Sequence, residues 1–491
     1  MSDITLVNMN LLFIRYMDSV ERELHVPLGP LYLTSVLEAA GFDVDFRDYQ
    51  LNTWDDPFEP EHVVDFCKDP APVIGLSCMA NLLPFVALAS KSLKDRYPDR
   101  TLVVGGVGPS SVEEEFLRAF PWVDIVGCGE GETSVPQLVG ALKNGGDLSG
   151  VPGIVYRDGD RLVRNPPPER IEDLDAVPMP AFHHVNLADY TGYGMVTSRG
   201  CPFPCTFCSV APIWGRKPFF RSVDNILAEM RHLNESAGVD LFLFQDEFFF
   251  AHEGRVLEFS DALVKSGLKV RWKAFGRVNL ATDAAMKAMA DTGCVEFRLG
   301  IESGSARILE RCKKGFTPDE AVDVVARATR YFPRVDTFFI WGYPFETMED
   351  FHQSVFQMVS FRLMGARILP SLLAMLPQTD IYREYRDSGL LRFQPAMLPE
   401  YMVTGHEICD DGHLQINDRH KLKFDFIADH PDIFPGFLLA DLDTNILPKF
   451  EVLKEHGFYP SRDREVSQTD SCGAHSSKLP PDPVSGAISR P

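Results

Sequence analysis

The sequence contains no long apolar run. A helix that spans a bilayer needs about 20 consecutive apolar residues, and no run of that length occurs among the 491 residues. The N-terminal segment also lacks the pattern of a signal peptide, in which a basic stretch precedes an uninterrupted apolar core. We therefore expect a cytoplasmic protein without a membrane span.

Basic residues are scarce relative to acidic ones. The chain has 48 Lys and Arg against 70 Asp and Glu, which gives a formal net charge of −22 at pH 7. Proteins that bind DNA or RNA normally carry a basic face. The charge balance argues against a nucleic acid as substrate or partner, although segments 269–273 and 327–334 hold enough Lys and Arg for a small local patch.

A second pair of closely spaced cysteines is lacking as well. Ten cysteines are spread along the chain, and only Cys201, Cys205 and Cys208 lie close together. In a reducing compartment, such a cluster indicates metal or redox chemistry rather than disulfides.

What the chain does have is a globular composition, with 45% hydrophobic residues, and a length that predicts two or three domains. Its first part alternates strand-like segments (4–13, 42–46, 73–77, 101–104, 124–126) with helical ones (28–40, 85–96). This alternation predicts an α/β fold that begins with a doubly wound, Rossmann-like parallel sheet over residues 1–150.

The rest of the chain changes character several times. Residues 151–188 are rich in Pro and Gly and predict a hairpin and linker. About six strand–helix units over 189–390 predict a partial (β/α)6 barrel rather than a closed ring of eight. Residues 391–460 predict a small, mainly helical extension, and 461–491, poor in apolar groups, predict a disordered tail.

The cysteine cluster follows the first strand of the predicted barrel, where barrel enzymes place their chemistry. Three thiolates can hold three irons of a [4Fe–4S] cluster and leave the fourth iron open to a small molecule. Two alternatives remain: a structural zinc site completed by His183, His184 or His252, and three unrelated buried cysteines. The absence of a second Cys pair disfavours zinc.

These residues resemble the signature of the radical S-adenosylmethionine (SAM) superfamily, CxxxCxxC with an aromatic residue before the last cysteine. Cys201, Cys205, Phe207 and Cys208 match it. The resemblance implies that the cysteines bind a [4Fe–4S] cluster, that SAM docks on the open iron, and that its reductive cleavage yields a radical that takes hydrogen from a small-molecule substrate. It also implies an electron donor such as flavodoxin or ferredoxin.

Later barrel segments are similar to further motifs of the superfamily, one per strand: 244–248, 300–304, 342–347 and 376–379. The resemblance implies cofactor contacts from Phe207, Gln245, Asp246, Glu247, Glu302 and Gly342. Each has an ordinary alternative, since a glycine after a strand can form a turn and an acidic residue there can cap a helix. Arg277 and Arg298 stand at predicted strand ends, where they could balance a carboxylate or form surface ion pairs.

The N-terminal part resembles the cobalamin-binding branch of the superfamily, in segments 27–33, 40–44, 103–106 and 127–132. This implies cobalamin as a third cofactor, with Gly105, Gly106, Gly129 and Glu130 as its contacts; such glycine-rich turns are as often only tight connections. The chain lacks the DxHxxG motif that supplies a histidine to cobalt, so a sheet that has lost the cofactor is the alternative. Cys78 lies near the corrin or is simply buried.

The resemblance favours cobalamin-dependent methyl transfer to an unactivated carbon or phosphorus of a natural-product or cofactor-like molecule. The alternative is cobalamin-independent dehydration, deoxygenation, epimerisation or cyclisation of a sugar-like or tetrapyrrole substrate. A binding protein with a structural or electron-transfer cluster would not need the later barrel motifs, and the acidic charge argues against an RNA-modifying enzyme. No catalytic residue is predicted.

Overall fold

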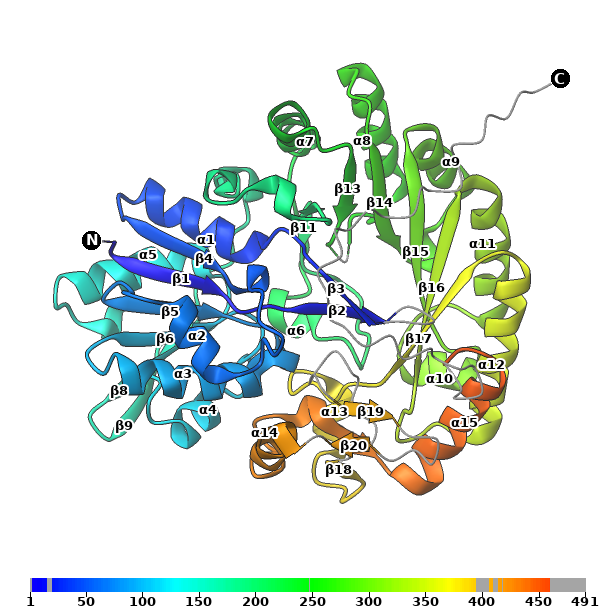
Figure 1. Cartoon of the computed structure of the whole chain (residues 1–491). Helices are drawn as coiled ribbons and strands as arrows, with labels where there is room; N and C mark the ends of the chain where they lie inside the picture. Colours follow the sequence, from blue (N-terminus) through cyan, green and yellow to red (C-terminus); the bar gives the residue numbers. More distant parts are fainter. Residues whose placement is uncertain are drawn as a thin grey trace.

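The computed structural model describes residues 2–15, 20–246, 248–393, 406–408, 414–416 and 418–459. Two α/β units lie side by side, and the C-terminal segment lies below both in the view of Figure 1. The predicted disordered tail, 461–491, lies outside the described residues.

The N-terminal unit is a doubly wound sheet with the strand order β4-β1-β5-β6-β7-β8-β9, and its first five strands are parallel. Side chains alternate along a strand, so Ile4 and Leu6 of β1 pack on one face and Val7 packs on the other. The strands are β1 (Ile4–Asn8), β4 (Val44–Asp48), β5 (Val73–Ser77), β6 (Thr101–Gly105) and β7 (Ile125–Gly127), and the helices are α1 (Leu28–Ala39), α2 (Pro60–Phe66), α3 (Leu83–Arg96), α4 (Glu113–Ala119) and α5 (Gly131–Lys143).

The predicted first strand, 4–13, is wrong in its second half. The sheet strand β1 ends at Asn8, and the chain then forms a separate antiparallel ribbon, β2 (Leu12–Arg15) with β3 (Val20–Glu23). The Asn8 side chain donates to Asp48 at 2.8 Å and accepts from Asn10 at 3.0 Å, so polar bonds hold the chain where it leaves the sheet. The sequence did not reveal that the sheet strand ends at Asn8, because apolar residues continue on both sides of this position.

Residues 151–188 begin with the hairpin of β8 (Ile154–Asp158) and β9 (Arg161–Arg164). β8 pairs antiparallel with β7, so the hairpin extends the N-terminal sheet rather than standing apart from it. Short 3-10 turns, among them η5 (Phe182–His184), then lead to the second unit.

The second unit is a partial barrel of six parallel strands in the order β10-β13-β14-β15-β16-β17, as the alternation predicts. A ring of helices covers its outer side (Figure 1). The strands are β10 (Gly194–Met195), β13 (Leu241–Phe244), β14 (Arg271–Gly276), β15 (Cys294–Glu302), β16 (Arg334–Trp341) and β17 (Arg367–Leu372), and the helices are α7 (Val223–Ala237), α8 (Glu253–Ser266), α9 (Asp283–Asp291), α10 (Ala306–Arg311), α11 (Pro318–Tyr331) and α12 (Met348–Leu363).

The C-terminal segment contains the expected helices and, unexpectedly, short two-stranded ribbons. Phe424 and Phe434 belong to the core of the N-terminal sheet, while Phe450 and Leu453 belong to the core of the barrel. The segment therefore binds both units together. Its elements are α13 (Asp380–Tyr385), β18 (Leu391–Phe393) with β21 (Leu438–Ala440), β19 (His406–Ile408) with β20 (Leu414–Ile416), α14 (Asp418–Ala428) and α15 (Leu447–Glu455).

The two units also contact each other directly. Helix α1 buries Leu28, Leu31 and Tyr32 in the same apolar cluster as the barrel core. Tyr190, just before the barrel, donates a hydrogen bond to Asp48 at the end of β4 over 2.7 Å. The mutual orientation of the sheet and the barrel is therefore fixed by packing and by buried polar contacts.

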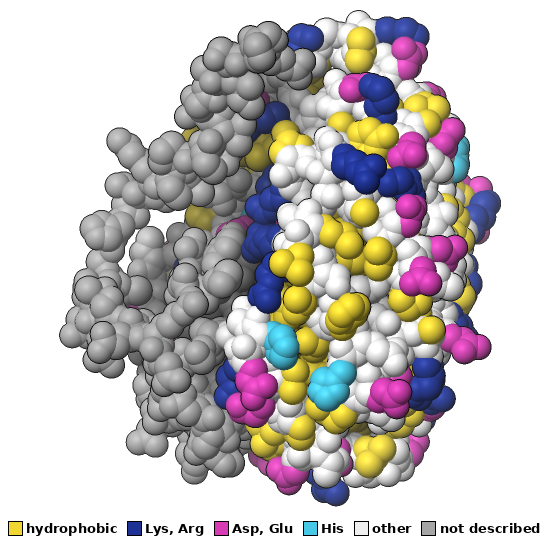
Figure 2. Space-filling model, turned by 90° about the vertical axis from the view of Figure 1, so that its right-hand side faces the viewer, with side chains coloured by type: hydrophobic (Ala, Val, Ile, Leu, Met, Phe, Trp, Pro, Cys, Tyr) yellow, Lys and Arg dark blue, Asp and Glu magenta, His cyan; other side chains and the backbone are white. Residues whose placement is uncertain are grey.

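The outer helical face of the barrel has no large patch of only acidic or only basic side chains. Acidic and basic side chains are interspersed there with apolar ones (Figure 2). Within the described residues, no helix combines the length and the apolarity that a membrane crossing requires.

Phe259 of α8 tests the barrel core, because it is fully buried and packs on Phe244, Phe249 and Trp272 with ring centroids 5.3–5.4 Å apart. Replacing Phe259 by Ala should lower the free energy of unfolding of the barrel by about 3–5 kcal/mol, because a cavity remains. Chemical denaturation measures this. Phe356→Ala on α12, where the side chain is 75% exposed, is the control and should change it by less than about 0.5 kcal/mol.

Candidate active site at the mouth of the barrel

The three clustered cysteines lie on one loop between the short strand β11 (Ser198–Arg199) and helix α6 (Val210–Trp214). All three are partly exposed. Gly200 has a φ of +98°, and a Cβ there would stand 2.9–3.2 Å from three backbone oxygens, so only glycine lets the loop begin this way. The Cys201 amide donates to the Gly215 carbonyl at 3.3 Å, which closes the loop back on the end of α6.

Two of the sulfur atoms accept hydrogen bonds from N–H groups. Arg277, directly after β14, donates to Cys205 Sγ at 3.4 Å, and the Val210 amide donates to Cys208 Sγ at 3.5 Å. Arg277 also lies over the ring of Phe203, 3.7 Å from its centroid. Such donors stabilise thiolate sulfur, the form that binds metal. The sequence offered Arg277 only as a carboxylate partner, and it contacts sulfur instead.

The spacing of the sulfur atoms disfavours a single zinc ion. Two thiolates on one zinc lie at most about 4.6 Å apart, because each Zn–S bond is about 2.3 Å. Among the described residues, the one group of three metal-ligand side chains within 4.8 Å of one another is Glu38, His183 and His184, without any cysteine. His252 is engaged elsewhere, since its Nδ1 accepts from the Arg255 amide at the start of α8. Within the described residues, this geometry therefore favours a cluster over a zinc site, and zinc stays the alternative that the sequence leaves open.

Asp246, after β13, lies buried beneath the cysteine loop. Its carboxylate accepts from the Thr197 amide at 2.9 Å, the Thr197 hydroxyl at 2.8 Å and the Ser198 hydroxyl at 2.7 Å. Burial raises the pKa of this carboxyl, and these hydrogen bonds oppose the rise. Protein groups occupy both oxygens, so Asp246 holds the start of the loop. Gln245 faces Gly194 of β10, and Glu247 lies outside the described residues.

Glu302, at the end of β15, has a backbone conformation that non-glycine residues seldom adopt, with φ of +70°. Its carboxylate pairs with Lys314 at 3.0 Å, and both side chains are more than nine-tenths buried. Lys314 Nζ also lies 5.7 Å from the ring centroid of Phe207, the aromatic residue of the cysteine motif. Lys314 thus joins Glu302 to Phe207 of the cysteine loop, and the sequence analysis did not predict this role for Lys314.

Gly342, after β16, also needs its glycine. Its φ is +83°, and a Cβ would stand within 3 Å of Leu372 and Ile446. Its amide donates to Glu346 Oε2 at 3.0 Å, and the same oxygen accepts from Lys449 of α15 at 2.8 Å. The C-terminal segment therefore fixes this motif from outside the barrel.

Arg199 joins the cysteine loop to the N-terminal sheet. It stands two residues before Cys201, its side chain is 8% exposed, and it pairs with Glu130 at 3.1 Å and, more closely, with Glu132. Both acids lie at the start of α5, after β7. The other oxygen of Glu130 accepts from the Ile171 amide at 2.8 Å. Protein groups therefore bond both oxygens of Glu130, and the residue links the two units, while its contact with cobalamin stays a prediction.

At the carboxyl edge of the N-terminal sheet, open or exposed positions lie at the ends of β5 and β6. A Cβ on Gly105 would meet no atom within 4 Å, and Met79, after β5, is 51% exposed. Gly106 and Gly129 have positive φ values, and a Cβ on them would crowd Cys78 and Pro168. These two glycines therefore serve the turns, while Gly105 leaves free space.

Cys78 itself is fully buried, and burial raises the pKa of its thiol to about 12. It is therefore a packing residue rather than a ligand. The loops after β5, β6 and β7 contain no histidine, while the connection from β1 to α1 contains His25, whose Nε2 lies 2.8 Å from the Glu23 carboxylate.

Comparisons with known proteins agree with this arrangement. A model of the radical SAM superfamily matches residues 195–358, and a model of the B12 binding domain matches residues 17–139. An uncharacterized methyltransferase of Pyrococcus horikoshii is 30% identical over 339 residues, which cover 67% of this chain and 72% of that protein. The chain belongs to the radical SAM superfamily, in its cobalamin-binding branch.

Two further likenesses extend across both units. The anaerobic magnesium-protoporphyrin IX monomethyl ester cyclase of Synechocystis sp. is 29% identical over 304 residues, 60% of each chain. The structure of the radical SAM methyltransferase TsrM from Kitasatospora setae, with cobalamin and a [4Fe–4S] cluster bound, superposes with a TM-score of 0.65 at 18% identity, over 81% of this chain and 78% of that one. This second likeness concerns the fold.

As a radical SAM enzyme of this branch, the chain uses a [4Fe–4S] cluster, SAM and cobalamin. The residues present fit these groups. Three partly exposed thiols on one loop provide soft ligands for iron, and Gly105 leaves open space at a strand end of the B12 binding domain, near exposed Met79. The loops after β5, β6 and β7 offer no histidine to cobalt.

The charge of Arg277 should raise the reduction potential of a cluster on these cysteines, because a cation near sulfur stabilises the more negative, reduced state. One charge about 5 Å away at an effective dielectric constant of about 20 corresponds to a shift on the order of 100 mV. We expect Arg277→Gln to lower the midpoint potential in an EPR-monitored redox titration. Arg271→Gln, at the opposite end of β14, should leave it unchanged; equal potentials in both variants would contradict this role.

Removing the two partners of Arg199 should destabilise the junction. In the double variant Glu130→Gln/Glu132→Gln, a buried guanidinium loses its counter-charges, which costs about 3–5 kcal/mol. Denaturant unfolding should show the loss, and the iron content after desalting should fall because Cys201 is two residues away. The control is Glu172→Gln, which breaks an exposed pair with Lys217 and should change little. Stability equal to that of the control would refute the coupling.

Proposed function

We propose that this chain is a cobalamin-dependent radical SAM methyltransferase that acts on an unactivated carbon or phosphorus of a small natural-product or cofactor-like molecule. The observation that carries the proposal is the buried contact of Arg199 with Glu130 and Glu132. It joins the cysteine loop to the carboxyl edge of the B12 binding domain. A radical generator and a methyl carrier must face the same substrate atom, and this contact supports that arrangement.

Each part of the site has a task in this proposal. Cys201, Cys205 and Cys208 hold the cluster, and Phe207, Gln245, Glu302 and Gly342 face SAM. Bound there, the three cofactors supply reductive cleavage of a sulfonium bond and a carrier for the methyl group. Asp246 keeps the start of the cysteine loop in place through Thr197 and Ser198.

Lys314, the ion-pair partner of Glu302, lies 5.7 Å from the ring centroid of Phe207. We propose that the Glu302 carboxylate accepts hydrogen bonds from polar groups of SAM while its ion pair with Lys314 holds it in position. The backbone strain at Glu302 serves to aim this carboxylate.

The electron comes from a small donor protein such as flavodoxin or ferredoxin. None of the eight described cysteines forms a disulfide, which suits a reducing compartment such as the cytoplasm. Likeness to the Synechocystis cyclase keeps ring formation on a tetrapyrrole as the second candidate, and product analysis distinguishes the two.

Corrin binding is tested by filling the free space at the strand end. Gly105→Leu adds a side chain where no protein atom lies within 4 Å, so the fold should persist while the corrin is blocked. After anaerobic incubation with hydroxocobalamin and gel filtration, we expect wild type to retain about one corrin per chain and Gly105→Leu to lose most of it. Gly150→Leu, also in open space, is the control. Full corrin retention by Gly105→Leu would place cobalamin elsewhere.

The reaction is tested with SAM that carries a deuterated methyl group. Under reducing conditions, the reconstituted enzyme should release 5′-deoxyadenosine, and cobalamin extracted from it should carry the label. Cys205→Ala should lose the iron absorbance near about 400 nm and the deoxyadenosine together. Deoxyadenosine without any label on cobalamin would favour the cyclase-like alternative over methyl transfer.

A further inference from the structure

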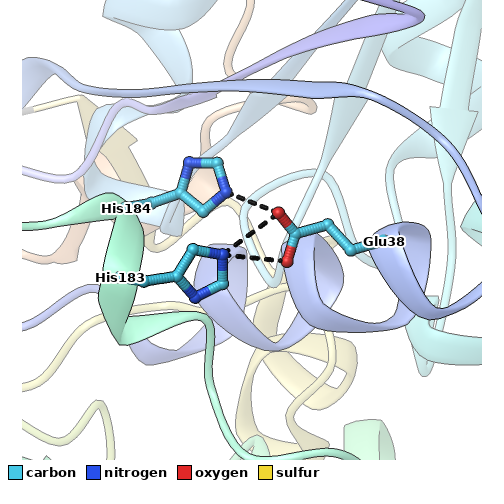
Figure 3. A group of neighbouring side chains, drawn as sticks. All are labelled: Glu38, His183 and His184. Carbon is cyan, nitrogen blue, oxygen red and sulfur yellow. Dashed lines mark hydrogen bonds and ion pairs between the residues drawn. The ribbon is translucent and has the colours of Figure 1, made fainter.

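A second candidate metal site lies away from the cysteine loop. Glu38 near the end of α1 faces His183 and His184, which belong to the 3-10 helix η5 in the linker between the sheet and the barrel. Both imidazoles point toward the carboxylate (Figure 3). The three residues take no part in the radical site.

The distances suit one metal ion. His184 Nε2 lies 2.7 Å and His183 Nε2 3.2 Å from Glu38 Oε1, and the three ligand atoms lie within 4.8 Å of one another. Two ligands of a tetrahedral zinc lie about 3.4 Å apart when each is about 2.0–2.1 Å from the metal. A small movement of the side chains would therefore place all three around one ion.

Helix α1 and the linker segment that contains His183 and His184 are held together by contacts that do not involve the three side chains. The Ala181 amide donates to the Leu31 carbonyl at 3.1 Å, and the Ser35 hydroxyl donates to the Met179 carbonyl at 2.5 Å. Phe182, next to the histidines, is 7% exposed and packs in the barrel core. The ligands are thus brought together by a scaffold, and binding need not order a loose chain.

The chemistry of the three groups also suits zinc. Imidazole nitrogen and carboxylate oxygen are both common zinc ligands. The side chains are 20–66% exposed, which leaves an entry path for the ion.

We propose that Glu38, His183 and His184 form a zinc site of two histidines and one carboxylate, completed by water. Zinc there ties α1 of the B12 binding domain to the linker that enters the barrel. Two neighbouring imidazoles, with ring centroids 4.6 Å apart, would otherwise compete for one carboxylate.

The test uses the full chain with its iron–sulfur cluster in place. The protein is dialysed anaerobically against a zinc buffer set by a chelator, and zinc and iron are measured by mass spectrometry. Wild type should retain about one zinc per chain, and His183→Ala/His184→Ala and Glu38→Gln should retain less than about a tenth of that. Iron content must stay the same in all samples, which excludes zinc on the cysteines.

A matched control removes two other histidines. His352→Ala/His456→Ala, both in exposed positions, should bind zinc as wild type does. Equal zinc in wild type and in the His183→Ala/His184→Ala variant would overturn the proposal and leave only an ion pair at this place.

Discussion

The buried contact of Arg199 with Glu130 and Glu132 is the constraint on which the active site depends. A guanidinium that is 8% exposed needs its counter-charges nearby, and both come from the start of α5 in the other unit. Arg199 also lies 5.3 Å from the ring centroid of Trp214, the last residue of the helix that follows the cysteines. One side chain therefore holds both ends of the cysteine loop against the B12 binding domain.

The same logic recurs around the loop. Asp246 holds its start through Thr197 and Ser198, and Lys314 joins Glu302 to Phe207. Buried polar groups are costly unless each finds a partner, so a network of this kind permits few alternative arrangements. These contacts fix the open end of the barrel against the N-terminal sheet. The C-terminal segment packs into the cores of both units and stabilises the same arrangement.

Much of this could be predicted from the sequence because it rests on local patterns. The spacing of the three cysteines and the alternation of strands and helices are properties of short segments, and the structure has both. The true partners of Glu130 and Asp246 could not be predicted, since Arg199 is 69 residues from Glu130 and Ser198 is 48 residues from Asp246. The importance of Lys314, Arg277 and Lys449 likewise depends on tertiary contacts. The ribbon after Asn8 was missed because Leu12, Phe13 and Ile14 of its first strand continue the apolar run of β1.

We propose that three sulfur ligands leave one iron of the cluster open to SAM. EPR spectra of the reduced enzyme, recorded before and after anaerobic addition of SAM, show whether SAM reaches that iron. We expect a cluster signal whose g values shift when SAM binds, because the ligand set of one iron changes. A cluster signal that is identical with and without SAM, or protein that holds zinc on these cysteines, would contradict it.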